Sequence, residues 1–199
     1  MGKRALSITD IRSYQPRVVK FEGAWQRLIG KPELKGSWII WGKSGNGKTS
    51  FALQLAAYLA RHTKVAYDSV EEGLSLTMQQ AIERVDMGEA KRNFTLLDKE
   101  SIEELTKRLK GQRSAQVVIV DSIQHAQLTK QQYIELLAKF PNKLFVFVSH
   151  ASGTEPMGKT AAFVRYDANV KIYVEGYWAN AASRYGGGER FDVWPEIHK

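Results

Sequence analysis

Gly42-Lys43-Ser44-Gly45-Asn46-Gly47-Lys48-Thr49 fits the pattern GxxxxGK[ST]. An apolar segment at 38–41 precedes this stretch, and a second apolar segment at 51–59 follows it. The order predicts a strand, a glycine-rich turn and a helix, which is the context that a phosphate-binding loop requires. We therefore expect a site for a nucleoside triphosphate. The alternative is an ordinary glycine-rich turn between a strand and a helix.

Each residue type in this loop suits the binding of phosphate. Glycines let the backbone wrap closely and turn its N–H groups inward, and a following helix points its free amides at the same anion. Lys48 places a compact positive charge on the terminal phosphates, and the Thr49 hydroxyl is placed to ligate Mg²⁺. We expect ATP and Mg²⁺ as cofactors, and the expected contacts are Gly42, Lys43, Ser44, Gly45, Asn46, Gly47, Lys48, Thr49 and Ser50.

Composition narrows the classes of protein. The chain has 199 residues, enough for one domain with a full core, and no segment has the roughly 20 apolar residues of a membrane span. No apolar signal segment is found at the N-terminus, so we expect a cytoplasmic protein without membrane contact. The absence of cysteine excludes disulfides, thiolate metal sites and cysteine nucleophiles. A net charge of +8 and a pI near 9.6 favour a polyanionic partner.

The pattern divides the chain into two parts. Residues 1–35 hold eight Lys and Arg against three Asp and Glu, and they predict a basic arm with a short helix at 22–29. Residues 36–199 predict an α/β core with a mainly parallel central sheet, helices on both faces and a C-terminal antiparallel extension. The expected strands are 38–41, 64–70, 94–97, 117–120, 144–148, 170–174, 177–181 and 190–193. The expected helices are 49–61, 74–85, 101–110 and 130–140.

Asp121 ends the apolar strand at 117–120. In proteins with such a phosphate loop, an Asp in this position lies opposite the loop and holds Mg²⁺ through water. Apolar strands that end in Asp are common, so the prediction depends on the phosphate loop upstream. With Thr49, Asp121 is the expected metal ligand.

Hydrolysis also needs a group that orients or deprotonates the attacking water. Glu71 and Glu72 follow the strand expected at 64–70, and only one of two adjacent residues on an extended chain can face the nucleotide. We expect Glu71 to be the catalytic residue, in preference to Glu72 and Asp68. The alternative is that both acids open a helix, where they favour its dipole.

His150 stands at the tip of the apolar strand at 144–148. If that strand lies between those ending in Gly42 and Asp121, His150 comes close to the terminal phosphate and senses its presence. The alternative is a surface histidine with no such role.

Four segments together resemble the RecA superfamily, and most of all the RadA/Sms branch of bacterial recombination ATPases. They are the phosphate loop; residues 67–73, similar to the branch's Y-V-S-G-E-E-S; residues 118–124, similar to V-V-I-D-S-I-Q; and residues 148–150 followed by a loop and the strand 170–176, similar to G-H-V and L-Y-F-E-G. The resemblance implies a RecA-like ATPase fold over about 36–194. It also implies that Glu71 is the catalytic glutamate.

One motif departs from that branch. Where the branch has K-N-R-F-G, this chain has Ala182-Ser183-Arg184-Tyr185-Gly186. Arg184 matches the branch's arginine, and the resemblance implies that it acts on ATP bound by a neighbouring subunit of a homo-oligomer. Ala182 stands where the branch has its lysine.

RecA-like cores contact DNA through two loops beside the nucleotide, and by position these are 124–130 and 151–162. The second is glycine-rich and polar, and it suits contacts with phosphates that carry no sequence information. The basic arm is expected to bind DNA or dock on a neighbouring subunit, with a solvated tail as the alternative. The leading hypothesis is an ATPase that binds DNA, preferably single-stranded, in recombination or repair. A DnaB-like helicase motor and a KaiC-like ATP-driven switch that ignores nucleic acid are the alternatives.

Overall fold

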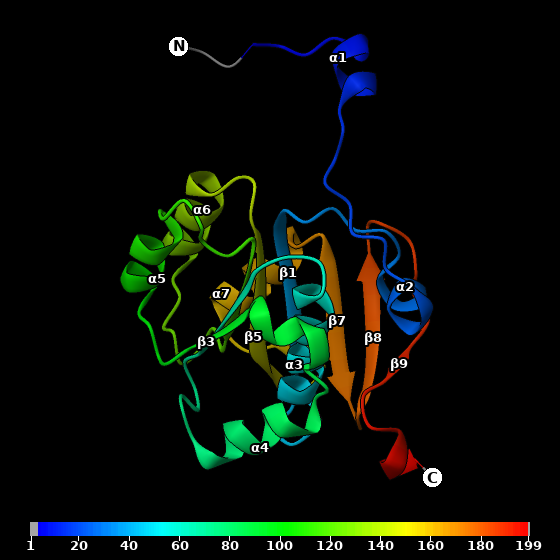
Figure 1. The fold of residues 1–199 in the computed structure, drawn as a ribbon, viewed down its shortest axis with the longest axis vertical. Helices are drawn as coiled ribbons and strands as arrows, with labels where there is room; N and C mark the ends of the chain where they lie inside the picture. Colours follow the sequence, from blue (N-terminus) through cyan, green and yellow to red (C-terminus); the bar gives the residue numbers. More distant parts are fainter. Residues whose placement is uncertain (1–3, 199) are drawn as a thin grey trace.

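A nine-stranded sheet forms the centre of the computed structural model, which describes residues 4–198 (Figure 1). Its strands run in the order β3-β2-β4-β5-β1-β7-β8-β9, and β6 pairs with β5. Strands β1 to β5 and β7 are parallel to one another, whereas β8 and β9 continue the sheet antiparallel. The strands are β1 Gly36–Gly42, β2 Val65–Ser69, β3 Phe94–Leu97, β4 Val117–Asp121, β5 Leu144–Ser152, β6 Glu155–Pro156, β7 Val170–Glu175, β8 Trp178–Ser183 and β9 Phe191–Asp192.

Helices cover both faces of this sheet. On one face α2 (Gly23–Ile29), α3 (Lys48–Ala60) and α4 (Leu76–Arg84) share a hydrophobic core with side chains such as Trp38 and Val146. On the other face α5 (Ile102–Leu109), α6 (Lys130–Lys139) and α7 (Lys159–Asp167) pack on Phe145, Phe147 and Val118. Burial from both sides explains why the central strands are apolar throughout and do not alternate.

Residues 4–35 fall into two stretches of different burial. Val19, Phe21 and Leu34 are buried in the core that contains α2 and α3, so the second stretch packs onto the sheet. Before it, α1 (Ile8–Ser13) buries no residue and projects from the body of the molecule. In Figure 1 the arrowhead of β7 marks the carboxyl edge of the parallel strands, and α1 lies at the opposite end of the molecule. The arm therefore leaves from the amino edge of the sheet.

The α/β architecture predicted from the sequence is confirmed, with β8 and β9 as the antiparallel extension and α2 as the short helix before β1. The strand expected at 170–174 as part of that extension runs parallel to β1 instead. The predicted strand at 94–97 has the observed bounds, and the predicted helix at 130–140 is longer than α6 by one residue. Two short 3-10 helices, η1 (Gly88–Arg92) and η2 (Pro195–His198), add to the predicted elements. No described helix is long and apolar enough to cross a membrane.

Two expectations need correction. The segment 151–162 is not a plain loop, because β5 continues to Ser152, turns into β6 and is followed by the first residues of α7. The strand pairing Ala151↔Pro156 and Ser152↔Glu155 holds this hairpin. The first part of the basic arm contains α1, whose Ser7 and Asp10 form a reciprocal N-terminal cap.

Candidate functional site

The strand order brings the predicted site residues to one edge of the sheet. β5 lies between β1 and β4, so Gly42 is paired with His150 and Asp121 with Val148. The carboxyl ends of parallel strands meet at this edge, where open α/β sheets bind ligands. The condition set for His150 from the sequence, a strand between those of Gly42 and Asp121, is therefore met.

The backbone of the glycine-rich loop depends on its glycines at two positions. Gly47 has a φ of +92°, in the region that side chains disfavour, and it directly precedes α3. At Gly42 a Cβ would lie 2.1 Å from the carbonyl oxygen of Val174, so only glycine fits against β7. The turn after β7 holds the loop from outside, because Asn46 Oδ1 accepts from the N–H of Gly176 at 2.8 Å.

Lys48 lies in the first turn of α3, and it is buried. Its Nζ donates to the carbonyl oxygen of Lys43 at 2.8 Å, across the mouth of the loop. Burial lowers the pKa of this ammonium, whereas the nearby carboxylates of Asp121 and Glu71 oppose that shift. A buried cation with one backbone partner is well placed to receive an anion, because a phosphate would supply the charge that the site lacks.

Asp121 is buried opposite the loop, at the end of β4. The Thr49 hydroxyl lies 3.4 Å from its Oδ2, and the Tyr67 hydroxyl donates to the same oxygen at 2.5 Å. Burial raises the pKa of Asp121 to about 6, and the bond from Tyr67 opposes the rise. A buried carboxylate beside a hydroxyl is a hard-oxygen donor set, which fits Mg²⁺ with waters completing its shell.

Glu71 reaches the same edge from the segment after β2. Its backbone N–H donates to the carbonyl oxygen of Asp121 at 3.0 Å, and its Oε2 lies 3.2 Å from His150 Nε2. Glu72 instead accepts from the Thr77 hydroxyl at 2.6 Å, near the start of α4. Asp68 is fully buried and accepts from the N–H of Glu100, on the side of α5. Of these acids, Glu71 alone has an exposed carboxylate beside His150.

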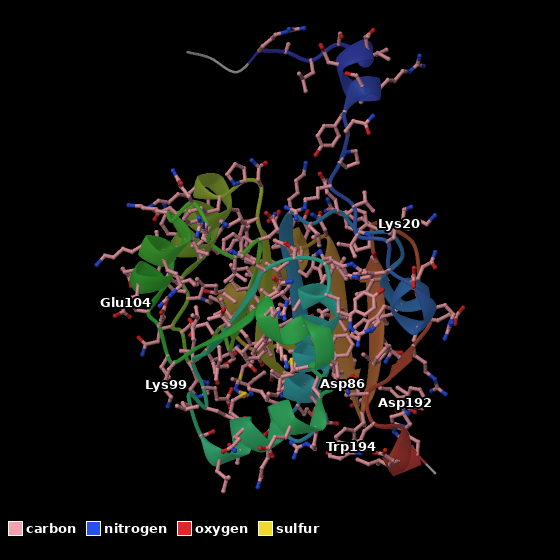
Figure 2. The ribbon with its side chains drawn as sticks, viewed as in Figure 1. Lys20, Asp86, Lys99, Glu104, Asp192 and Trp194 are labelled. Atoms are coloured by element: carbon pink, nitrogen blue, oxygen red, sulfur yellow. The ribbon has the colours of Figure 1, made fainter. Side chains whose placement is uncertain are left out.

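A cleft of about 280 Å³ unites these groups. The loop residues Ser44, Gly45, Gly47, Lys48, Thr49 and Ser50 line it together with Glu71, Glu72, Asp121 and His150. Three further lining residues were not predicted from the sequence: Arg84, Tyr177 and Trp194. Trp194 lies close to the C-terminal end (Figure 2), and the Arg84 guanidinium stands 5.6 Å from its ring centre.

Arg184 lies elsewhere. β8 runs antiparallel to β7, so Ser183 is paired with Val170, where β7 begins, and Arg184 follows directly. Arg184 is therefore at the amino edge, roughly 20 Å from the phosphate loop for a strand of six residues. It is exposed and does not line the cleft of its own chain.

Gln124 links the two segments that were predicted to contact DNA. Its Nε2 donates to the Ser149 hydroxyl at 2.9 Å and to the carbonyl oxygen of Met157 at 2.7 Å. Its Oε1 accepts from the N–H of His150 at 3.2 Å. The turn after β4, the end of β5 and the β5–β6 hairpin are thus joined beside the cleft.

Comparison with known proteins finds similarity in structure but not in sequence. No family model and no curated protein sequence matches it. Among solved structures, the flagellar accessory protein FlaH from Methanocaldococcus jannaschii superposes with a TM-score of 0.63 at 15% identity, covering 90% of this chain and 96% of that one. A KaiC-like protein from Pyrococcus horikoshii OT3 gives 0.62 at 17% identity, with 88% and 94% covered.

The RadB recombinase superposes with a TM-score of 0.56 at 20% identity, with 84% of this chain and 90% of that one covered. These identities are low, so the likeness concerns the fold. Strand order, phosphate loop and comparisons agree, and the chain has the RecA-like P-loop fold.

Proposed function

We propose that this protein binds ATP with Mg²⁺ and hydrolyses it, and that its Glu71 carboxylate activates the attacking water. One observation carries the proposal: Glu71 lines the same cleft as Lys48 and Asp121, with its carboxylate exposed. This arrangement places a base, a phosphate-binding cation and a metal-binding carboxylate around one space.

The residues divide the work of phosphoryl transfer. The amides of the loop and Lys48 hold the phosphates and favour the charge that spreads over them in the transition state. Thr49 and Asp121 would hold Mg²⁺, which supplies charge neutralisation to the phosphates when bound. Glu71 accepts a hydrogen bond from the attacking water, and His150, 3.2 Å from its carboxylate, keeps Glu71 turned to the phosphate side and senses the terminal phosphate.

The nucleoside would occupy a second cleft of about 410 Å³ beside the first. Ser50, Arg84 and Trp194 line both clefts, so a ligand can extend from one into the other. Trp194 offers an aromatic face, and stacking on such a face tolerates any base. This placement explains why aromatic and cationic side chains from α4 and the C-terminal segment gather next to the loop.

We further propose that hydrolysis is coupled to DNA, preferably single-stranded, in recombination or repair. The net charge of +8 and the resemblance of residues 118–124 to the RadA/Sms branch support this assignment. Gln124 connects the cleft to the hairpin through His150 and Met157, and it gives DNA on these segments a route to the catalytic edge.

A homo-oligomer is part of the same proposal. Arg184 is exposed at the amino edge, where it can reach ATP only in another subunit. The arm leaves from that edge as well, and it carries the exposed apolar side chains of Leu6, Ile8 and Ile11. Exposed apolar groups on a projecting arm favour docking on a neighbouring subunit over contact with DNA.

The KaiC-like switch remains a second candidate, because the superpositions with FlaH and the KaiC-like protein cover most of this chain. The DnaB-like motor is the third. The ATPase rate with and without single-stranded DNA separates them. Stimulation that weakens steeply with salt supports the recombination-type ATPase, because phosphate contacts release counterions. A flat response would overturn DNA coupling and favour the switch, and strand displacement would favour the helicase.

A further inference from the structure

Two histidines and one glutamate from three separate segments converge at the rim of the cleft. Glu71 follows β2, His125 lies in the turn after β4, and His150 belongs to β5. Glu71 Oε2 is 3.2 Å from His150 Nε2 and 3.3 Å from His125 Nδ1. The two imidazole rings are 5.7 Å apart between centres, and all three donor atoms lie within 4.8 Å of one another.

These distances suit a tetrahedral ion. Zn²⁺ binds imidazole nitrogen and carboxylate oxygen at about 2.0–2.2 Å, so two of its tetrahedral ligands lie roughly 3.3–3.5 Å apart. Both Glu–His separations are already close to that value. Small rotations of the two imidazole rings would bring His125 Nδ1 and His150 Nε2 to the same separation from each other. Both side chains are accessible to solvent, His125 to 47% and His150 to 21%. That accessibility also leaves an entry path and room for water as a fourth ligand.

The donor set selects one class of metal. Imidazole nitrogen favours zinc and its neighbours, whereas Mg²⁺ prefers oxygen and keeps its waters. The proposed Mg²⁺ position between Thr49 and Asp121 offers two oxygens and no imidazole. Among the side chains that the structure describes, Glu71, His125 and His150 are the one group of three His, Cys, Asp or Glu donors close enough together to hold an ion.

We propose that Glu71, His125 and His150 form a binding site for one divalent transition-metal ion of the zinc class. The ion replaces the two Glu–His contacts and displaces the Ser122 hydroxyl, which lies 3.0 Å from the same His125 nitrogen. The bound metal also coordinates the Glu71 carboxylate, which can then no longer accept a hydrogen bond from the attacking water. Zinc is therefore an inhibitor of hydrolysis, and this consequence alone rests on the proposed function.

The test is a zinc titration of the full chain without an affinity tag, in excess Mg²⁺ and without nucleotide, followed by calorimetry. The wild type is expected to bind one Zn²⁺ per chain. Loss of a residue that only supports a metal ligand weakens metal binding roughly 10- to 100-fold. Because His125 and His150 are proposed as ligands themselves, His125→Asn and His150→Asn should each weaken zinc binding by at least that much. His62→Asn is the matched control, because that exposed histidine contacts Tyr58 at the end of α3, far from the three donors, and should leave zinc affinity unchanged.

Co²⁺ gives a second readout, because a tetrahedral site with imidazole ligands produces visible absorption bands. The double variant that combines His125→Asn with His150→Asn should lose these bands. Metal-free thermal unfolding of each variant shows that the fold is intact. No stoichiometric binding by the wild type, or equal affinity in the double variant, overturns the site. If zinc binds as expected and hydrolysis continues unchanged, the site stands and the role of Glu71 falls. If zinc fails to bind but Glu71→Gln stops turnover, the proposed function stands and the metal site falls.

Discussion

Replacing Lys48 by methionine should separate ligand binding from folding. The ammonium is buried with one hydrogen bond, to Lys43, and burial lowers its pKa. The folded state without ligand therefore bears the cost of this charge. Methionine has a similar length and is apolar, so the variant gives up about 1 kcal/mol of hydrogen bonding and gains relief from desolvation. Its melting temperature without ligand should stay within about 4 °C of the wild type or exceed it.

The effect on the ligand should be much larger. A charge-assisted hydrogen bond contributes about 1.5–3 kcal/mol, so two such bonds to phosphates correspond to a loss of roughly 150-fold or more in affinity. At 100 times the wild-type Kd, ATP with Mg²⁺ stabilises the wild type by about 2.7 kcal/mol, or roughly 5–11 °C for a chain of this length. At the same concentration Lys48→Met should shift by less than about 1 °C.

Thermal unfolding with and without ATP and Mg²⁺ measures both quantities in one assay. Lys143→Met is the matched control: burial lowers the pKa of Lys143 too, and this lysine contacts Ser114 at the other edge of the sheet. That variant should keep the full ligand-induced shift. Retention of the shift by Lys48→Met, or a large loss of its stability without ligand, would refute the reasoning.

Three further predictions concern other parts of the molecule. Burial raises the pKa of Asp68 to about 7, so the folded protein binds this proton more tightly than the unfolded chain, and the wild type loses stability as pH rises from about 4 through 7. In urea unfolding, the free energy of unfolding of Asp68→Asn should therefore rise relative to the wild type over that range, by on the order of 1.4 kcal/mol for each pKa unit. A difference that stays constant with pH would contradict this. Arg184→Ala should lower the ATPase rate at least about tenfold in the assembled state, as expected for an arginine acting across subunits; a rate per subunit independent of protein concentration in the wild type would contradict action in trans. Trp194→Ala should weaken ATP binding by about 1–3 kcal/mol in a fluorescent-nucleotide titration, and an unchanged Kd would remove Trp194 from the base site.

The sequence predicted those parts of the fold that local pattern determines. The phosphate loop, the five apolar parallel strands and their helices follow from glycine spacing and from runs of buried residues. β5 beyond His150 was not predicted, because its extension depends on pairing with β6. α7 was also missed, since it follows Gly158, begins with the polar Lys159 and Thr160, and has only Ala161 and Val164 fully buried. A sequence signal for α1 did exist in the spacing of Ser7 and Asp10.

In the site too, local sequence predicted some residues, and the others depend on which strands lie side by side. Asp121 and Glu71 could be proposed because each directly follows an apolar strand. Tyr67 stands in a quoted motif, yet its bond to Asp121 depends on two strands lying side by side. His125 has no local signal, and its closeness to Glu71 arises only when β2, β4 and β5 align.

The most direct test of the central claim compares phosphate release and ATP binding in the wild type and Glu71→Gln. The wild type should release phosphate only with Mg²⁺. Glu71→Gln should bind ATP within a few-fold of the wild type but hydrolyse it at least about 100-fold more slowly, as expected when a positioned base is lost. Undiminished hydrolysis by Glu71→Gln, or a wild type that neither binds nor hydrolyses ATP, would contradict the account.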